Sequence, residues 1–323
     1  MEVEDGTGHP TRYCTIRDNV IEQHYGGGIY LVPSAHHNLL EGNVITNCGE
    51  TTTFGKPGIQ VSGSNNSIRK NVIYNPESQP ITMEAQVVIG TPFSADNNFI
   101  YNNTIYNCWY GFGLLVKNNI SPECSAEGNL IANNIFFGAT GNYEGRQTAM
   151  AFYLYDANAD HNWCDPDIPQ CLPYGTHWGG NAMLNNCIRR SDLGADDATL
   201  ISWARDADYG GGWVGWDLAQ VQATDPVAWG GNIGSNPVLR SESPETFGLT
   251  NGWWQIQETS PCVNAGITVY DEIGAYVASL NPEFGWGNLT YAGSAPDIGA
   301  YELDGENPAP LSGPFIRISP TSR

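Results

Sequence analysis

The feature that most constrains the fold is an eight-residue unit that recurs along the first part of the chain. Each copy has two asparagines five residues apart, with an apolar residue two positions after each asparagine. Five full copies occupy residues 38–45, 66–73, 98–105, 129–136 and 181–188, and residues 15–21 carry the second half of a sixth. The second asparagines fall at 19, 43, 71, 103, 134 and 186. A constant unit at irregular spacing is typical of short strands joined by loops of variable length.

The spacing of apolar residues inside the unit indicates parallel strands and not helices. Apolar and β-branched residues alternate with a period near two, whereas helical repeats have a period of 3.6. Because one turn cannot bury its own apolar face, turns must stack and share a core. The asparagines would then sit at a corner, with their amides paired between turns. Two inward columns are predicted: Leu40, Ile68, Ile100, Ile131, Met183, and Ile45, Ile73, Ile105, Phe136, Ile188.

A further strand in each turn is predicted at residues 28–32, 58–61, 87–90, 111–116 and 149–154. The unit N-x-I-x-x-N-x-I, followed by G-I-x-[LV], resembles the repeat of right-handed parallel β-helix proteins. Residues 236–239, 260–266 and 296–302 (N-P-V-L, S-P-C-V-N-A-G and P-D-I-G-A-Y-E) are similar to the closing segments of secreted bacterial β-helix proteins. This resemblance implies an all-β, right-handed parallel β-helix with an irregular C-terminal capping region. It also points to the β-helix superfamily of polysaccharide lyases and glycoside hydrolases.

The predicted organisation is one domain over residues 1–302 and a Pro/Ser-rich linker or tail over 303–323. Repeats run from about 12 to 190, and a Trp-rich capping region follows from 191 to 302. Nine of the ten tryptophans lie after residue 150. Residues 217–222 are expected to form a short helix. Residues 236–302 are expected to cover the C-terminal end of the solenoid, because an open end would expose strand edges.

The net charge and the cysteine content limit which partners and which location the protein can have. A net charge of −21 with only three lysines excludes nucleic acid as a partner, because proteins bind its phosphates through Lys and Arg. No apolar run is long enough for a membrane span. Eight cysteines favour an oxidising, extracellular or cell-surface location, although no signal peptide is recognisable in this chain. Cys164 and Cys171 are the predicted disulfide; the other six cysteines cannot be paired from sequence and could be small buried hydrophobes.

A polysaccharide or glycan is the predicted partner, with the site on the outer face between residues 76 and 180. Glycoside hydrolysis needs two carboxyl groups around the scissile bond, and the candidates are Glu84, Asp156 and Asp160. A lyase acting on an acidic polysaccharide would need calcium on so acidic a protein. The stacking candidates for sugar rings are Trp109, Tyr110, Tyr153, Tyr155 and Trp178.

Other polar residues receive structural interpretations. Arg17, Glu41, Arg69 and Tyr101 share one outward column and are interpreted as a cross-strand ladder. Lys70 is interpreted as a surface residue. His36 and His37 should point to opposite faces, within a turn before Asn38. The alternative function is a non-catalytic cell-surface, adhesive or filament-forming module, in which an open β-helix end allows end-to-end self-association.

Overall fold

A computed structural model gives the fold of the chain. It describes residues 2–3, 11–22, 27–48, 57–74, 81–88, 91–108, 113–116, 128–138, 142–143, 146–147, 150–153, 181–189, 201–203, 214–224, 226–240, 254–280, 291 and 293–303.

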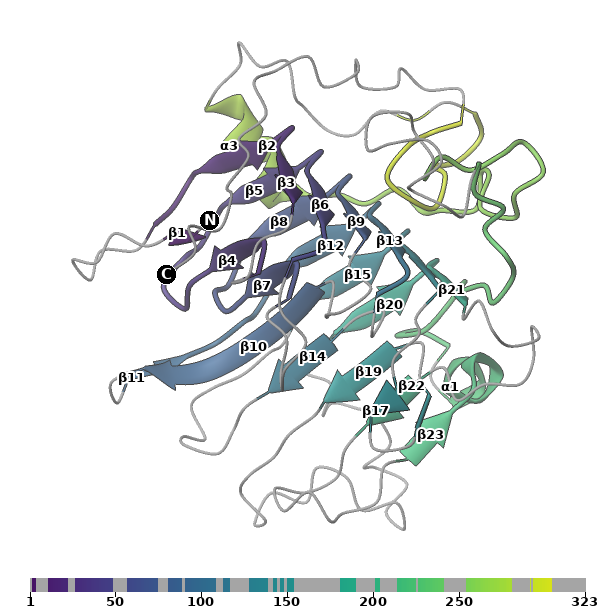
Figure 1. Cartoon of the computed structure of the whole chain (residues 1–323), viewed down its shortest axis with the longest axis horizontal. Helices are drawn as coiled ribbons and strands as arrows, with labels where there is room; N and C mark the ends of the chain where they lie inside the picture. The colour runs from purple at the N-terminus through teal and green to yellow at the C-terminus, as the bar shows by residue number, and fades with distance from the viewer. Residues whose placement is uncertain are drawn as a thin grey trace.

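Three sheets of parallel strands stack into a solenoid, and each turn contributes one strand to each sheet (Figure 1). This confirms the predicted all-β parallel β-helix. The second sheet runs β2 (Thr15–Arg17), β5 (Leu39–Glu41), β8 (Ser67–Arg69), β12 (Phe99–Tyr101), β15 (Leu130–Ala132) and β20 (Ala182–Leu184). The third runs β3 (Val20–Glu22), β6 (Val44–Thr46), β9 (Val72–Tyr74), β13 (Thr104–Tyr106), β16 (Ile135–Phe137) and β21 (Cys187–Arg189).

The first sheet has nine strands and departs from the parallel order at two places. Its order is β1 (Glu2–Val3), β4 (Ile29–Leu31), β7 (Ile59–Val61), β10 (Ile81–Val88), β14 (Gly113–Val116), β19 (Met150–Tyr153), β22 (Ile201–Trp203) and β23 (Val214–Trp216). β11 (Thr91–Phe93) pairs antiparallel with β10, and β23 pairs antiparallel with β22. A separate hairpin joins β17 (Asn142–Tyr143) to β18 (Arg146–Gln147).

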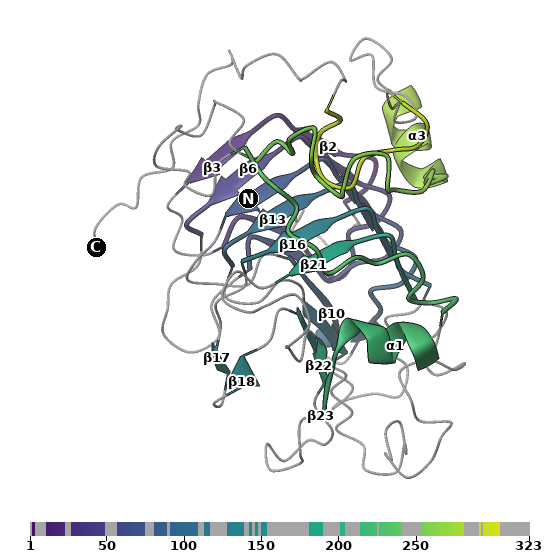
Figure 2. The ribbon, with the colours of Figure 1, turned by 90° about the vertical axis from the view of Figure 1, so that its right-hand side faces the viewer.

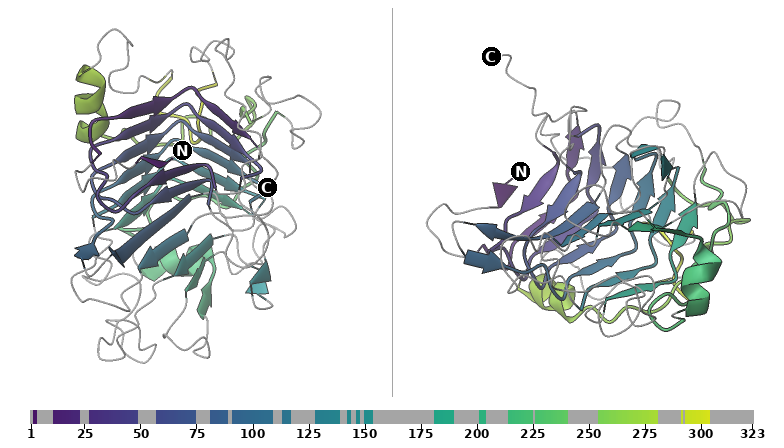
Figure 3. Two further views of the ribbon diagram at one scale, coloured as in Figure 1. Left: turned by 60° about the vertical axis from the view of Figure 1, so that its left-hand side comes forward. Right: turned by 90° about the horizontal axis from the view of Figure 1, so that it is seen from below.

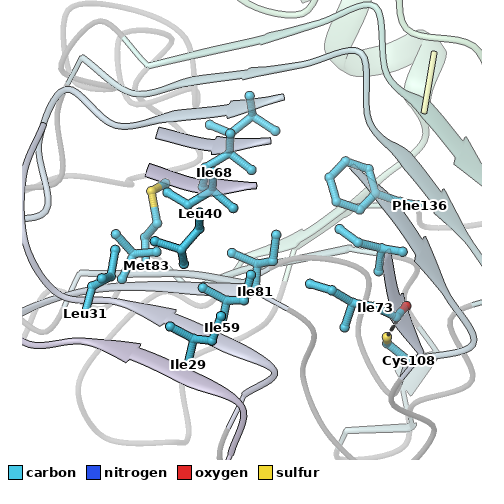
Figure 4. Close-up of a cluster of buried hydrophobic side chains, with 14 of the residues drawn as sticks. Ile29, Leu31, Leu40, Ile59, Ile68, Ile73, Ile81, Met83, Cys108 and Phe136 are labelled. Atoms are coloured by element: carbon cyan, nitrogen blue, oxygen red, sulfur yellow. Dashed lines mark hydrogen bonds between the residues drawn. The ribbon is translucent and has the colours of Figure 1, made fainter. Parts of the chain in front are cut away.

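Both predicted inward columns form the core. Strand register aligns Leu40 with Ile68 and Ile68 with Ile100, and the same alignment continues through Ile131 to Met183. The column from Ile45 to Ile188 is aligned in the same way in the third sheet. All ten side chains are buried, and the first sheet adds its own inward residues such as Leu31 and Met83 (Figure 4). The left view of Figure 3 shows these strands as stacked rungs.

One predicted strand position is wrong. The third copy of the strand in the first sheet was expected at residues 87–90, but Ile81 and Met83 are the residues aligned with Ile59 and Val61 of β7. β10 is eight residues long, and Val87 and Val88 instead pair with β11 in a hairpin. The apolar run at residues 87–89 suggested the wrong end of the strand, because Ile81 and Met83 alternate with polar residues.

The asparagines form two ladders, as predicted. In each step the backbone N–H and the Nδ2 of one asparagine donate to the Oδ1 of the next, as from Asn71 to Asn103 at 2.9 and 3.0 Å. One ladder runs Asn38, Asn66, Asn98, Asn129, Asn181; the other runs Asn19, Asn43, Asn71, Asn103, Asn134, Asn186, Asn232. Asn232 was missed because its segment lacks the first half of the unit. The ladders satisfy buried backbone groups at the corners, where the chain bends.

Every described residue that directly precedes a ladder asparagine has a positive φ, which explains the corner geometry. Examples are Asp18, Lys70 and Asn102, with φ of 53°, 54° and 51°. Asparagine and glycine adopt this conformation most readily, so the repeat is rich in both. Lys70 therefore stands at a corner of the coil and not in the middle of a strand.

The C-terminal part covers the solenoid in two ways. α1 (Leu218–Thr224) begins at Asp217, which forms a capping box with Gln220, and this confirms the predicted short helix. Leu218, Val221 and Trp229 join the main core beside the last turn. The described residues in 254–280 and 293–303 instead run along the side, across the third sheet, and α3 (Glu272–Ser279) lies beside the second sheet (Figure 2). The expectation that residues 236–302 cover the C-terminal end is therefore wrong for this segment, because corner asparagines bind it along the length of the coil.

Candidate functional site

The outward column of the second sheet forms a buried polar cluster. Strand register aligns Arg17 with Glu41, Glu41 with Arg69, and Arg69 with Tyr101, which confirms the predicted ladder. The Nε of Arg69 lies 3.1 Å from Glu41 Oε1, and its Nη1 donates to the Tyr101 hydroxyl at 2.9 Å. Glu41, Arg69 and Tyr101 are 0%, 1% and 2% exposed, so the ladder is not a solvated surface feature.

Asp271, from the C-terminal segment, closes this cluster. Its Oδ2 accepts hydrogen bonds from Ser67 at 2.5 Å and from Tyr101 at 2.9 Å, and it lies 3.6 Å from Arg69 Nη1. Its Oδ1 accepts from the backbone N–H of Gly274 at 2.7 Å, so Asp271 is also the N-cap of α3. Each carboxylate oxygen of Asp271 thus has a separate task, one on the sheet and one on the helix. The cluster attaches α3 to the coil.

Burial dominates the electrostatics of the cluster. Burial raises the pKa of Glu41 above its ordinary value, and the neighbouring Arg69 only partly offsets this effect. Burial also raises the pKa of Tyr101. For Arg69, burial acts to lower the pKa, but Tyr101, Glu41 and Asp271 together outweigh it and the pKa rises. The arginine stays charged and neutralises the acids around it, which fits a structural role.

Lys70 lies beside this cluster in a cleft between the coil and the C-terminal segment. The cleft measures about 390 Å³, including space open to solvent, and its lining includes Tyr101, Tyr291 and Glu302. Burial lowers the pKa of Lys70, and no ion pair of this lysine occurs among the described residues. The Glu302 carboxylate accepts from the backbone N–H of Asp297 at 3.1 Å. Lys70 is thus half-buried at a cleft, unlike the open surface residue that the sequence suggested.

The first sheet carries two of the residues singled out in the sequence. Glu84 in β10 aligns with Leu115 in β14, and Leu115 aligns with Tyr153 in β19. Glu84 and Tyr153 therefore share one register position, two strands apart. That separation is roughly 9.6 Å, twice the spacing of neighbouring strands. Asp156, Asp160, Trp109, Tyr110, Tyr155, Trp178 and the Cys164/Cys171 pair lie outside the described residues.

His36 and His37 face each other, contrary to the prediction. Their Nδ1 atoms are 2.8 Å apart, which is hydrogen-bonding distance. The prediction assumed a regular strand, but His37 has a φ of 55° and ends the alternation of side chains. Burial lowers the pKa of His36, with further lowering by the charges of His37 and Arg12. The rings also pack against Tyr13, with centroids 6.4 and 5.7 Å away.

The pair supplies two imidazole nitrogens and no larger donor set. Within the described ranges, no group of three or more His, Cys, Asp or Glu side chains is placed to hold a metal ion. Imidazole nitrogens bind transition metals, so the pair offers two ligands of that kind. The same ranges contain no group of three or more such side chains for the calcium that a lyase acting on an acidic polysaccharide would require.

Among the described residues, no helix is both long and apolar enough to cross a membrane.

The fold defines a parallel β-helix protein, and one family comparison agrees with this class. The family model described as "Periplasmic copper-binding protein (NosD)" matches residues 5–165, about half of the chain. No curated protein matches the chain. The match covers the repeats up to β19 and ends before the C-terminal segment that covers the coil.

Sequence reasoning missed Asp271 and Glu302, which reach the coil from the C-terminal segment. One available signal was the third sheet, because several of its outward residues, such as Val44, Val72 and Ile135, are apolar like its inward ones. A strand that is apolar on both faces must be covered on both. The cover consists of Leu239, Trp254, Ile256, Cys262, Ile298 and Ala300.

Proposed function

We propose that this β-helix protein is carbohydrate-active and degrades a polysaccharide on the face of its nine-stranded sheet. The observation that carries the proposal is the common register position of Glu84 and Tyr153. A carboxyl group and an aromatic residue two strands apart are separated by roughly the length of two sugar units. An aromatic ring stacks on a sugar, and a carboxyl group provides acid or base catalysis.

The sequence also offers a second carboxyl group close to Tyr153. Asp156, the other candidate carboxyl group, follows Tyr153 by three residues in the sequence. Two carboxyl groups at roughly 5 to 10 Å would suit a retaining or an inverting hydrolase. The cleft beside Lys70 is a poorer candidate, because Glu302 is the only acidic residue among its described lining residues and that carboxylate binds a backbone N–H.

The test is product release from a panel of neutral and acidic polysaccharides, with and without calcium. Reducing sugar without absorbance at 235 nm would identify a hydrolase, and absorbance at 235 nm a lyase. Glu84→Gln should lower the rate at least about 100-fold, the usual contribution of a general acid or base. Glu258→Gln, an exposed carboxyl group elsewhere, should stay within about twofold. Equal rates for both variants would refute the site.

The competing hypothesis is the non-catalytic cell-surface, adhesive or filament-forming module. No product from any polysaccharide, together with elution as a polymer in size-exclusion chromatography, would favour it. In that case, binding to immobilised glycans separates an adhesive protein from a filament.

Copper binding is a second candidate function, favoured by the 2.8 Å approach of the His36 and His37 nitrogens and by the description of the matching family. Calorimetric titration with Cu²⁺, followed by electron paramagnetic resonance, should show nitrogen ligation. The variant carrying His36→Gln and His37→Gln should lose this signal, whereas Cys14→Ser should keep it. Because the pKa of His36 is lowered, protons should compete with copper only below about pH 6.5.

A further inference from the structure

Four of the described cysteines are buried, and they lie in two places. Cys48 and Cys108 lie at the corner that follows the third sheet. Their thiols donate to the carbonyls of Thr46 and Tyr106, each at 3.4 Å. β9 separates the two turns concerned, so the cysteines are roughly 9.6 Å apart and out of disulfide range.

Cys187 and Cys262 are different, because they meet although 75 residues separate them. Both are 0% exposed and belong to the same apolar cluster outside the third sheet. Cys187 lies in β21 and Cys262 in the covering C-terminal segment, and Cys262 lies close enough to raise the pKa of the Cys187 thiol. The Cys187 thiol also lies 3.2 Å from the carbonyl oxygen of Ser235.

The surrounding contacts hold these two segments in place independently. Ile298 donates its N–H to the carbonyl of Cys262, and Gly299 donates to the carbonyl of Asn133, next to β16. Ile135 of β16 is the register partner of Cys187. Nearby, Asn185 Nδ2 donates to the carbonyl of Ala265 at 2.8 Å. The approach of the thiols therefore follows from backbone contacts on both sides of them.

We propose that Cys187 and Cys262 form a disulfide bond that ties the C-terminal segment to the last full turn of the coil. Both S–H bonds break and one S–S bond forms, with loss of two protons and two electrons. The electrons pass to a disulfide oxidant by thiol–disulfide exchange, the chemistry available to proteins outside the cytoplasm. The neighbouring Cys262 and burial raise the pKa of Cys187, so exchange is slow once the segment has docked. The disulfide bond therefore forms during folding, before the segment has docked.

The deciding experiment is disulfide mapping of the full chain, produced in an oxidising compartment. The protein is denatured without reductant, alkylated, digested and analysed by mass spectrometry. The expected result is a linked pair of peptides containing Cys187 and Cys262, with no link between Cys48 and Cys108. Alkylation of Cys187 and Cys262, or linkage of either one to another cysteine, would overturn the proposal.

A stability measurement provides a second readout with a matched control. Reductant should lower the melting temperature of the wild-type protein by several degrees. The double variant with Cys187→Ala and Cys262→Ala should show no such shift. The double variant with Cys48→Ala and Cys108→Ala, which removes two equally buried thiols, should keep it. An equal response of the two double variants would contradict the assigned pairing.

Discussion

The outer faces of the first and second sheets follow the same alternation but have different environments. In the second sheet the outward column of Glu41, Arg69 and Tyr101 is covered by Asp271 and α3 and is almost fully buried. In the first sheet the outward residues Tyr30 and Gln60, aligned with each other, remain partly exposed. The same repeat thus produces a sealed contact in one place and an accessible face in the other.

The difference shows that an outward-facing residue of a solenoid is not necessarily a surface residue. A charged ladder in water is worth a fraction of a kcal/mol, whereas removing one partner from a buried cluster leaves an uncompensated charge. The residues that look most like a catalytic strip are therefore the ones that hold the C-terminal segment. The following predictions test this contrast.

Arg69→Met should have the largest effect. It leaves Glu41 and Asp271 buried without their shared cation, and the expected loss of unfolding free energy is about 3 to 5 kcal/mol. Urea denaturation followed by circular dichroism measures it. Arg17→Met removes an arginine from the same column at its exposed end, where the guanidinium pairs with Asp18, and should cost no more than about 0.5 kcal/mol. Equal losses would mean that burial by the C-terminal segment does not matter.

Asn103→Ala should have the next largest effect. It removes the Oδ1 that accepts two hydrogen bonds from Asn71 and leaves buried donors unsatisfied, at a cost of about 2 to 3 kcal/mol. The same denaturation experiment applies. Asn97→Gly deletes an exposed corner amide at a φ of 52° that glycine tolerates, so its cost should stay below about 1 kcal/mol. If Asn103→Ala were as stable as Asn97→Gly, the asparagine ladder would not contribute to the stability of the fold.

Lys70→Met should have the smallest effect and the opposite sign. Burial lowers the pKa of Lys70, so its charged form is disfavoured in the folded state and the unfolded chain binds the proton more tightly. The contribution of Lys70 to stability therefore falls as the pH drops from 10.5 through the folded-state pKa. At pH 7 the methionine variant should be more stable than the wild type, and the gap should narrow at pH 10.

Urea midpoints of the two proteins at both pH values measure this gap. Lys70→Arg keeps a charge at both pH values and should show no gain at either. A wild-type protein that is more stable than Lys70→Met at pH 7 would instead mean that attraction by Glu41 and Glu302 outweighs burial.

Much of the coil could be predicted because its determinants are close in sequence. The unit at residues 98–105 specifies two ladder asparagines, two inward isoleucines and the corner between them. The candidate site was harder to predict. Glu84 and Tyr153 were chosen individually, and only strand register showed that they share a position. His37 was misjudged because its positive φ does not follow from the residue type.

By itself, the sequence determined the stacked strands, the two inward columns and the asparagine ladders of this protein, because alternation and a repeated unit are local properties. Only the tertiary structure decided which outward faces are covered. That choice depends on contacts between residues far apart in the chain: Asp271 with Ser67 and Tyr101, and Cys262 with Cys187. Such pairs leave no periodic trace, since each occurs once, and burial by a distant segment converts the same side chains from a solvated ladder into an anchor.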